Sequence, residues 1–252
     1  MNKTRFLGVI PARYASTRFP GKPLVKIGGK MMIQRVYEQV QDCLDEVCVA
    51  TDDERISEAV KSFGGNVVMT SEHHKSGTDR CREAFEKAGK DFDVVVNIQG
   101  DEPFIQPEQI ELIKKCFSSA EDTEIATLVK PFTTEDSIDA LFNPNSPKVI
   151  LNSNSEAIYF SRAVIPFLRN HPKENWLKEQ TFYKHIGLYA YRTDVLCKIT
   201  ELSQSPLEIA ESLEQLRWIE NGYKIKVAIT HHETIGIDTP EDLAIAEKLF
   251  LK

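Results

Sequence analysis

Several features that mark other classes of protein are scarce or absent in this sequence. Only five of its 252 residues are cysteines, and no two of them have the C-x-x-C spacing of a zinc site. No apolar run reaches the roughly 18 residues of a membrane-spanning helix, and the first residues contain no apolar stretch of signal-peptide length. We therefore expect reduced, mostly buried thiols and a soluble, cytoplasmic protein that does not act at a membrane.

Basic residues are also in the minority. The formal net charge of −7 disfavours nucleic acid as the main partner, because binding to a phosphate backbone needs an excess of lysine and arginine. Internal repeats, low-complexity tracts and linkers are absent. The chain does have 41% hydrophobic and 27% charged residues, which at this length is enough to bury a core, so disorder is not expected. We predict one domain covering residues 1–252.

Apolar runs of strand length alternate with segments of helical periodicity in the first half of the chain. Strands are predicted at residues 6–10, 47–50, 66–69, 94–98 and 125–129, with helical or loop sequence between them. Short apolar strands separated by helices predict an α/β fold, in which a mostly parallel sheet is covered on both faces.

The pattern changes after about residue 132. Strands predicted at 148–152, 156–160 and 185–191 have less helix between them and indicate a mixed sheet in a small protruding lobe. The polar segment 171–180, with its isolated Trp176, is predicted to be a surface loop, although an interface or a lid would also fit it. The predicted order ends with a helix containing Leu213, Leu216 and Ile219, a strand at 225–229 and a helix at 240–249.

The loop after the first predicted strand carries three cations in an otherwise acidic chain. They are Arg13, Arg18 and Lys22, and small residues at 15, 16 and 21 let the backbone approach a ligand closely. Ligands of open α/β sheets bind at the carboxyl ends of the strands, and a triphosphate needs both cationic side chains and backbone N–H donors. The loop therefore predicts a phosphate site, although an exposed basic loop would also fit. It matches neither G-x-G-x-x-G nor G-x-x-x-x-G-K-[ST], so dinucleotide oxidoreductases and P-loop NTPases lose support.

Two aspartates follow apolar runs far apart in the sequence. Asp101 comes after the strand predicted at 94–98, and Gly100 before it lets the chain turn. Asp238 follows the apolar run 235–237 and precedes Pro240, so it also fits a helix N-cap. A bound triphosphate needs a cation such as Mg²⁺ to neutralise its charge, and one or two carboxylates suit that ion. The spacing of these two residues in the sequence does not pair them.

Residues 10–24 resemble the signature of the 3-deoxy-manno-octulosonate (Kdo) cytidylyltransferase family, also called the CMP-Kdo synthetases. The similarity continues in order over nearly the whole chain, through residues 50–53, 77–80, 97–103, 159–162, 165–166, 185–191, 213–217 and 238–242. It implies a nucleotide-diphospho-sugar transferase-like fold, with a nucleotide-binding half at about 1–130 and a sugar-binding and dimerisation half at 131–252. It also implies a homodimer built on the small mixed-sheet lobe.

The resemblance further implies a reaction and the residues that perform it. CMP would pass from CTP to the anomeric hydroxyl of Kdo, an acidic eight-carbon sugar, releasing pyrophosphate and forming CMP-Kdo for lipopolysaccharide synthesis. Asp101 and Asp238 would bind Mg²⁺ and, with Arg13 and Lys22, form the catalytic set. The implied nucleotide-binding residues are Pro11, Ala12, Arg13, Arg18, Lys22, Ser76, Gly77, Thr78 and Gln99. The implied sugar-binding residues are Arg80, Arg162, His185, Tyr189, Glu211 and Gln215.

Arg80 also has a local interpretation. It stands in the first turn of a helix that Thr78 is expected to cap, and the helix dipole disfavours a cation there. That misfit suggests another use, such as binding a carboxylate. Otherwise, Arg80 would pair with Asp79 or Glu83 at the surface.

The other proposed sugar-binding residues fall into two pairs with a spacing of four. His185 and Tyr189 lie in a predicted strand and therefore point to the same face of its sheet. Glu211 and Gln215 are expected to share a helix face. The ordinary pKa of histidine makes His185 a possible general base, but we expect it to orient the sugar instead.

Three alternatives differ in the acceptor or in the chemistry. The 8-amino analogue of Kdo fits as well as Kdo does, whereas a sialic acid fits less well because the motifs are those of the Kdo enzymes. A nucleotide-sugar glycosyltransferase would carry D-x-D after a strand, and Asp101-Glu102-Pro103 does not have that pattern. A nucleotide sensor without activity would not need both Asp101 and Asp238.

Overall fold

The computed structural model describes residues 3–15, 19–89, 91–118, 122–233 and 236–250 of the chain. The chain divides into two compact units. Unit 1 consists of Met1–Glu111, Ala190–Thr200 and Thr234–Lys252, and unit 2 consists of Leu112–Tyr189 and Glu201–Glu233. Each unit takes segments from both predicted halves of the chain, and the single domain over 1–252 stays a prediction.

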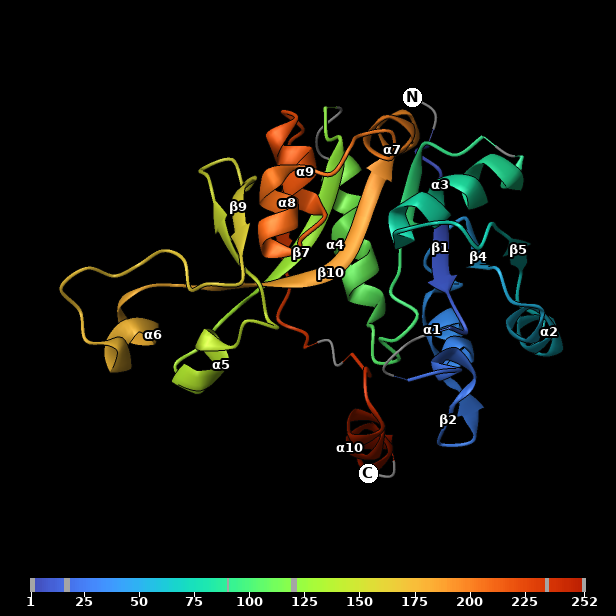
Figure 1. The fold of residues 1–252 in the computed structure, drawn as a ribbon, viewed down its shortest axis with the longest axis horizontal. Coiled ribbons are helices and arrows are strands. Elements are labelled where there is room, and N and C mark those ends of the chain that lie inside the picture. The colour runs from blue at the N-terminus through green and yellow to red at the C-terminus, as the bar shows by residue number, and fades with distance from the viewer. Residues whose placement is uncertain (1–2, 16–18, 90, 119–121, 234–235, 251–252) are drawn as a thin grey trace. The chain divides into compact units, whose positions relative to one another are not determined.

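Unit 1 contains a parallel sheet built from buried apolar runs. Figure 1 shows β1 (Phe6–Ala12), β4 (Glu46–Thr51) and β5 (Val67–Met69) in this order, and β6 (Val94–Asn97) pairs with the other side of β1. Leu7, Val9 and Ile10 are completely buried. Because successive side chains of a strand point to opposite faces, both faces of β1 are covered. The predicted parallel strands of this region are confirmed, each to within two residues at either end.

Helices and a short antiparallel ribbon complete unit 1. The ribbon joins β2 (Lys26–Ile27) to β3 (Lys30–Met31). Asp53 caps a helix as predicted, since its side chain accepts a hydrogen bond from Arg55 N. The helical segments are η1, a 3₁₀ turn at Lys22–Leu24, α1 (Met32–Val40), α2 (Glu54–Ser62), α3 (Gly77–Ala88), α7 (Thr193–Ile199) and α10 (Pro240–Phe250). A further helix, α4 (Pro107–Ser118), begins in unit 1 and continues into unit 2.

Unit 2 contains the mixed sheet that the second half of the sequence predicts. β7 (Ile125–Pro131) pairs in parallel with β11 (Ile225–Ile229) and lies next to β10 (Tyr183–Arg192). β8 (Lys148–Leu151) pairs antiparallel with both β10 and β9 (Ala157–Ser161). The helical segments of unit 2 are α5 (Ile138–Phe142), η2 (Lys173–Asn175), α6 (Trp176–Glu179), α8 (Pro206–Glu211) and α9 (Gln215–Glu220).

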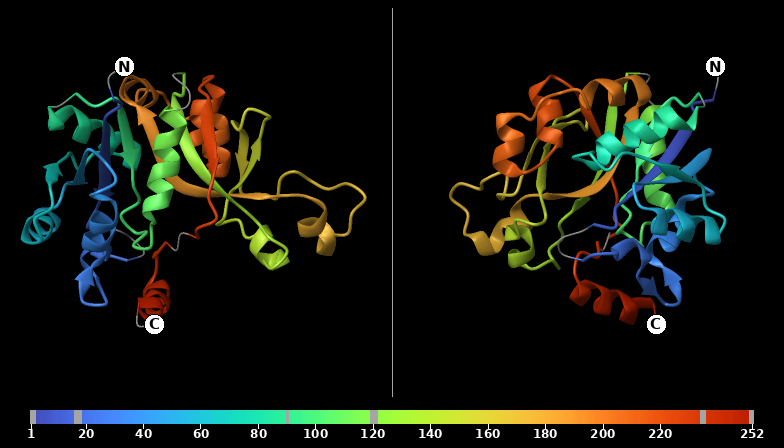
Figure 2. Two further views of the ribbon diagram at one scale, coloured as in Figure 1. Left: turned by 180° about the vertical axis from the view of Figure 1, so that it is seen from behind. Right: turned by 45° about the vertical axis from the view of Figure 1, so that its right-hand side comes forward.

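The surface prediction for 171–180 is confirmed for most of the segment, which is exposed, but two short helical segments replace the predicted loop and Trp176 is buried. Trp176 is only 2% exposed and belongs to a core cluster with Leu141 and Phe182, where its ring stacks on that of Phe182 at 6.0 Å between centroids. Figure 2 shows α5 and α6, which carry Leu141 and Trp176, side by side. The indole N–H is also satisfied, because it donates to His171 O at 3.0 Å. A single buried side chain on a short helix leaves no periodic pattern, so the place of Trp176 in the core could not be predicted from its mostly polar segment.

The single helix predicted around Leu213 is in fact two helices. Ser212 has φ 51° and ψ 48°, a left-handed conformation that ends α8 directly after Glu211. A second helix, α9, begins at Gln215. The prediction that Glu211 and Gln215 share a helix face was therefore wrong, because the left-handed residue between them ends the periodicity on which that inference depends.

Two further expectations concern membranes and cysteines. Among the described helices, none combines the length and the apolar composition that crossing a lipid bilayer requires. All five cysteine side chains lie in the described residues and are thiols, and Cys48, Cys81 and Cys116 are buried. The reduced, mostly buried cysteines expected from the sequence agree with this finding.

Candidate active site

The loop after β1 depends on a glycine at its closing turn. Gly21 has a φ of 70°, in the left-handed region that favours glycine, and its N–H donates to Tyr14 O at 2.9 Å. The turn η1 begins directly after it with Lys22 and Pro23, and proline suits a first turn because no partner is needed for its missing N–H. Lys22 is thus fixed at the start of a short helix. Arg18, the middle cation of the predicted phosphate loop, lies outside the described residues.

The side chains of Lys22, Asp101 and Asp238 meet in one group, which we call the lysine–aspartate cluster. Lys22 Nζ donates to Asp101 Oδ2 at 2.6 Å and to Asp238 Oδ1 at 3.0 Å. The Lys22 side chain is 15% exposed, whereas those of Asp101 and Asp238 are 30% and 43% exposed. The cluster therefore has a largely buried cation and two carboxylates that solvent or a ligand can reach.

Backbone contacts explain why residues so far apart in the sequence meet. Ile98 N donates to Val9 O at 2.9 Å, and a Cβ on Gly100 would lie only 3.0 Å from Pro11 O. The turn after β6 therefore packs closely against the end of β1. Ile237 N then donates to Asp101 O at 3.0 Å, which places the residue that follows, Asp238, beside Asp101.

A small apolar core holds the same segments together. Each of the three segments that carry the cluster contributes one residue to it, namely Phe19, Phe104 and Ile237. Burying an apolar side chain of this size contributes about 1.5–3 kcal/mol. Packing in this core therefore helps to hold the three charged side chains close to one another. Its full membership is Ile27, Met32, Ile237 and Ala246, with Phe19, Phe104 and Leu243 packed against them.

Asp238 is not the cap of α10, which was one of its two predicted roles. Thr239 and Asp242 form a reciprocal pair, in which Asp242 N donates to Thr239 Oγ1 at 3.2 Å and Thr239 N donates to Asp242 Oδ2 at 2.9 Å. This is the geometry of a capping box, with Thr239 as the N-cap. The capping function is thus performed by its neighbours, and the Asp238 carboxylate is directed to Lys22.

Lys22 is an ammonium ion in this setting. Burial by itself lowers the pKa of Lys22, but the hydrogen bonds and negative charges of Asp101 and Asp238 outweigh it and raise the pKa above its ordinary value. The cluster as a whole therefore carries two negative charges and one positive charge. An added divalent cation would make its charge positive, which suits a triphosphate.

The donor set of the cluster fits Mg²⁺. This ion is usually bound through one or two carboxylates, with water and substrate phosphates completing its six ligands. Asp101 and Asp238 are such a pair. Within the described residues, no group of three His, Cys, Asp or Glu side chains is placed to hold a metal. Mg²⁺ bound by this pair would therefore depend on the phosphate oxygens of a nucleotide for much of its coordination.

Arg13 projects from the chain just after Pro11 and Ala12 at the end of β1. Its Nη2 donates to the main-chain oxygen of His74, and the residue is half-buried. Burial and the positive charge of Arg80 lower the pKa of Arg13, while the charges of Asp52 and Asp79 act in the opposite direction. An arginine keeps its proton in all these conditions, so Arg13 supplies a second cation at the end of β1.

The start of α3 lies against the same end of β1. The predicted cap at Thr78 was wrong, because Ser76 caps the helix: Ser76 Oγ accepts from Asp79 N at 3.1 Å, and Asp79 Oδ2 accepts from Ser76 N at 3.1 Å. Thr78 is buried in the first turn instead. A Cβ on Gly77 would lie 3.7 Å from the side chain of Pro11, so the predicted nucleotide-binding residues Pro11 and Gly77 are neighbours.

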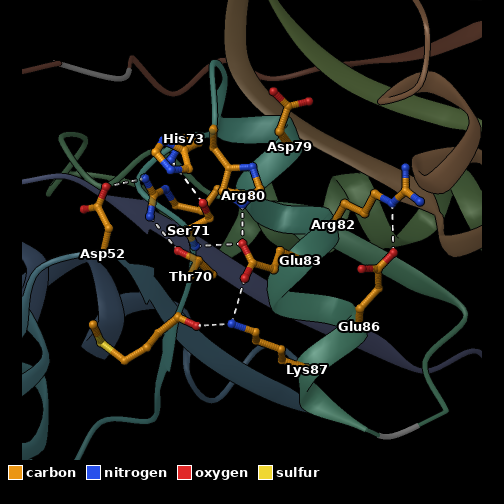
Figure 3. Close-up of polar contacts among 12 residues, drawn as sticks. Asp52, Thr70, Ser71, His73, Asp79, Arg80, Arg82, Glu83, Glu86 and Lys87 are labelled. Carbon is orange, nitrogen blue, oxygen red and sulfur yellow. Dashed lines mark hydrogen bonds and ion pairs between the residues drawn. The ribbon is translucent and has the colours of Figure 1, made fainter.

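Arg80 is completely buried and paired, not at the surface. Its Nη1 donates to Thr70 Oγ1 at 2.5 Å, and its Nη2 donates to Asp52 Oδ2 at 2.8 Å (Figure 3). Pairing with Asp79 or Glu83 at the surface, the alternative weighed from the sequence, is therefore not what the structure shows. Contact of Arg80 with a sugar carboxylate stays a prediction.

Arg162 and Glu211 bind each other in unit 2. Glu211 Oε2 accepts from Arg162 N at 2.9 Å, and Glu211 Oε1 accepts from Ser161 Oγ at 2.6 Å. The guanidinium of Arg162 donates in turn to the main-chain oxygens of Glu211, at 2.7 Å, and Ser212, at 3.2 Å. The structure therefore brings these two predicted sugar-binding residues together, at the end of α8.

His185 and Tyr189 are also in contact, as their spacing on a strand predicts. Their ring centroids are 5.2 Å apart, and Phe160 meets the His185 ring edge-on at 5.2 Å. His185 Nε2 forms a hydrogen bond with Thr127 Oγ1 at 3.1 Å. Burial among these groups lowers the pKa of His185 to about 3, so its imidazole is neutral at physiological pH. Gln215 is buried in the same unit, on α9.

The low pKa of His185 predicts a pH-dependent contribution to stability. Below pH 6.5, the ordinary pKa of about 6.5 means that His185 is protonated in the unfolded chain. In the folded chain its imidazole stays neutral until the pH falls to about 3. Folding free energy is therefore lost as the pH falls through this window, at about 1 kcal/mol per pH unit. The variant His185→Gln should be less stable than the parent chain at pH 7, and this difference should shrink in urea unfolding at pH 5.5 and 4.5.

Tyr189→Phe is the matched control for His185→Gln. It alters the neighbouring ring without removing a group that titrates in this range, so its stability difference from the parent chain should stay constant between pH 7 and 4.5. A His185→Gln difference that is equally constant would show that the imidazole is not buried in its neutral form.

Comparison with known proteins identifies the family. The sequence profile of the cytidylyltransferases matches residues 7–225. Over 240 residues, the chain is 69% identical to the 3-deoxy-manno-octulosonate cytidylyltransferase of Parabacteroides distasonis, and the match covers 95% of each chain. The chain belongs to the Kdo cytidylyltransferase family. The resemblance drawn from its motifs is thus confirmed, and the family is one of enzymes.

Solved structures agree with membership of the Kdo cytidylyltransferase family. A structure of CMP:2-keto-3-deoxy-manno-octonic acid synthetase complexed with CTP superimposes with a TM-score of 0.90 at 41% identity, over 98% of this chain and 99% of that one. A cytidylyltransferase from Leptospira borgpetersenii matches with a TM-score of 0.61 at 16% identity, over 95% and 84% of the two chains, which shows a shared fold alone. The predicted α/β class with a mostly parallel sheet is confirmed.

The site residues implied by the family resemblance are distributed over both units. The described nucleotide-binding candidates, from Pro11 to Gln99, lie in unit 1 with the lysine–aspartate cluster. Arg162, His185, Tyr189 and the residues around Glu211 lie in unit 2. Arg80, which the resemblance also places at the sugar, lies in unit 1. The roles of all these residues stay predictions, and the two units do not follow the predicted sequence boundary at residue 130.

One buried polar residue near the predicted nucleotide-binding residues was not among the sequence predictions. Asn97 ends β6 and is 4% exposed, and its Oδ1 has no hydrogen-bond partner among the described residues. A Cβ on Gly77 would lie 3.8 Å from its amide nitrogen. A buried amide oxygen without a hydrogen-bond partner is uncommon in a folded protein. The signal was its place inside the motif 97–103, from which only Gln99 and Asp101 were chosen.

Proposed function

We propose that this chain transfers CMP from CTP to the anomeric hydroxyl of Kdo, releasing pyrophosphate and forming CMP-Kdo, a precursor for lipopolysaccharide synthesis. The observation that carries the proposal is the lysine–aspartate cluster, found in a chain that is 69% identical to a 3-deoxy-manno-octulosonate cytidylyltransferase. The cluster has the charges that a metal–triphosphate complex requires. The CTP complex of a structure with a TM-score of 0.90 supports the choice of nucleotide.

The chain's own residues would act on the triphosphate mainly through position and charge. Arg13 and Lys22, together with Arg18, would bind the phosphate oxygens, and Lys22 would exchange its bonds to the carboxylates for bonds to phosphate. Asp101 and Asp238 would hold Mg²⁺, which supplies charge neutralisation and acidifies an attacking hydroxyl. Holding the α-phosphate in line with the acceptor is the main contribution left to the protein.

The acceptor would be recognised by polar groups of unit 2. Arg162, fixed by Glu211, would meet the carboxylate, and His185 and Tyr189 would contact hydroxyls, with Gln215 as the remaining predicted contact from this unit. Since the pKa of His185 is about 3, its imidazole is a poor proton acceptor at neutral pH. This supports a role for His185 in orienting the sugar.

Two properties implied by family resemblance belong to the same proposal. We infer a homodimer, which large exposed apolar side chains in unit 2 support: Ile158 is 52% exposed and Phe167 is 73% exposed. We also infer a cytoplasmic location, which the thiol state of the cysteines supports.

The proposal is tested by pyrophosphate release in the presence of Mg²⁺. We expect release with CTP and Kdo, and at most a few per cent of that rate with UTP or ATP. Parallel reactions with 8-amino-Kdo and a sialic acid decide which acceptor is used, because they leave the nucleotide constant. Release with the 8-amino sugar but not with Kdo would replace the acceptor, and no release from CTP with any of these acids would remove the proposed function.

A further inference from the structure

One face of α3 is bonded along its length to the segment that precedes it. Arg80, Glu83 and Lys87 are spaced by three and four residues, so they share this face (Figure 3). Lys87 Nζ donates to Met69 O at 2.9 Å, Arg80 Nη1 donates to Thr70 Oγ1, and Glu83 Oε2 accepts from Ser71 N at 2.8 Å. The helix thus fixes three consecutive residues, 69–71, as the chain leaves β5.

Glu83 has the most contacts of the three. Its Oε1 accepts from Lys87 Nζ at 2.7 Å, and its Oε2 accepts from both Ser71 N and His74 Nε2. Burial alone raises the pKa of Glu83, but these hydrogen bonds and the charge of Lys87 lower it to about 2. The carboxylate is therefore ionised at neutral pH, and it holds both ends of the turn 71–74.

This turn leads directly to Arg13. The main-chain oxygen of His74 accepts a hydrogen bond from Arg13 Nη2. Glu83 fixes the side chain of His74, and the main chain of His74 fixes Arg13. A carboxylate on the far side of the turn is thus connected to a cation at the end of β1 through a single intervening residue.

We propose that Glu83 is a positioning residue for nucleotide binding, which acts by holding His74 so that its carbonyl oxygen orients the Arg13 guanidinium toward the triphosphate. The inference rests on the proposed function, which is where Arg13 is assigned to bind the triphosphate. Removing the Glu83 carboxylate removes both of its hydrogen bonds to the turn 71–74, the one from Ser71 N and the one from His74 Nε2. Arg13 then loses its fixed orientation, and a misplacement of about 1 Å is enough to cost on the order of 100-fold.

A purely structural role for Glu83 makes a different prediction. If Glu83 only stabilised the fold, its removal would lower the melting temperature and affect nucleotide and acceptor equally. A positioning role affects the nucleotide alone, and it acts through Arg13. The chain offers a matched control in Glu86, which lies on the same helix and bonds to Arg82 at 2.8 Å in an exposed i,i+4 pair (Figure 3).

The test is CTP binding by titration calorimetry in Mg²⁺, together with steady-state KM values for CTP and Kdo. We expect Glu83→Ala to weaken CTP binding 10- to 100-fold and to raise KM for CTP by a similar factor, roughly the effect of a misplaced binding group. In Glu83→Ala, KM for Kdo should change less than about twofold. In Glu86→Ala, CTP binding and both KM values should also change less than about twofold, since surface pairs of this kind contribute little. Glu83→Gln keeps an acceptor for Ser71 N but loses the charge, and it should fall between the parent chain and Glu83→Ala.

A double variant decides whether the effect passes through Arg13. In an Arg13→Lys background, Glu83→Ala should add less than about threefold to the loss of CTP affinity, because the bond to His74 is already altered. An undiminished effect in that background, or equal losses for CTP and Kdo, would overturn the proposal. If Glu83→Ala does not fold, Glu83→Gln carries the same comparison. Calorimetry needs no turnover, so a chain that binds CTP without releasing pyrophosphate would refute the proposed function while leaving the role of Glu83 measurable.

Discussion

Replacing Asp101 with asparagine is expected to lower the rate of pyrophosphate release at saturating CTP and Kdo by at least about a thousandfold. Asparagine has the same size but no charge, so the negative charge 2.6 Å from Lys22 Nζ and one of the two proposed Mg²⁺ ligands are lost. Each tenfold in rate corresponds to about 1.4 kcal/mol, and loss of a metal ligand removes several kcal/mol of charge stabilisation.

The fold should survive this change. The main-chain oxygen of Asp101, which accepts from Ile237 N, is the same in the variant, and the apolar core around Ile237 is untouched. Thermal unfolding should therefore stay within about 2 °C of the parent chain, the shift expected for less than 1 kcal/mol. Glu108→Gln, an exposed carboxylate in the first turn of α4, serves as the control and should keep full activity. Near-normal turnover by Asp101→Asn would remove the metal assignment.

Replacing Lys22 with methionine is expected to have two opposite effects. Activity should fall by about a hundredfold or more, because a cation that binds the triphosphate is lost. In the free chain, Asp101 and Asp238 would lose the ammonium that lies between them, and the two carboxylates would then attract divalent cations. Mg²⁺ without nucleotide should therefore stabilise Lys22→Met more than it stabilises the parent chain.

Thermal melting in a Mg²⁺ series measures this second effect. At a Mg²⁺ concentration ten times the dissociation constant, binding contributes about 1.4 kcal/mol, or roughly 3 °C for a chain of this size. Lys30→Met, which removes an exposed lysine paired with Glu38, should show no added response to Mg²⁺. Equal Mg²⁺ responses in Lys22→Met and the parent chain would mean that the two carboxylates do not act as one site.

The parallel sheet was predictable because its strands are buried on both faces. Continuous apolar runs such as residues 94–96 give a strong signal that does not depend on distant parts of the chain. The short helices gave no comparable signal. Trp176 and its neighbour Leu177 stand in an otherwise polar segment, and the break at Ser212 needs a left-handed residue that is not glycine, so neither feature follows from periodicity.

The parts of the candidate site were predictable one at a time. Asp101 and Asp238 each stand just after a strand or an apolar run, and Lys22 lies on the loop after β1, where ligands of this class of fold bind. Their meeting was not predictable from spacing, because the backbone bond between Ile237 and Asp101 that produces it joins segments with no sequence signal in common. Family resemblance supplied that pairing, and the structure confirms the contact of both carboxylates with Lys22.

Arg80 shows what local rules can and cannot reveal. A cation in the first turn of a helix opposes the helix dipole, which correctly indicated that Arg80 has some other partner. The partner is Asp52, at the end of β4, and no rule of helix spacing points there. The contacts of Glu83 with Ser71 and His74 were missed for the same reason.

The bond between Lys22 and Asp238 also bears on how the protein is made. The two residues are 216 positions apart, and contacts of such separation form after local ones as a chain emerges from the ribosome. A nascent chain that has been synthesised through β1, β4, β5, β6 and the turn after β6 contains Lys22 and Asp101. It does not yet contain Asp238 or Ile237, whose backbone bond places Asp238 beside Asp101. Translation would thus deliver the second carboxylate last, and a ribosome-bound chain that stops short of it would be unable to consume CTP.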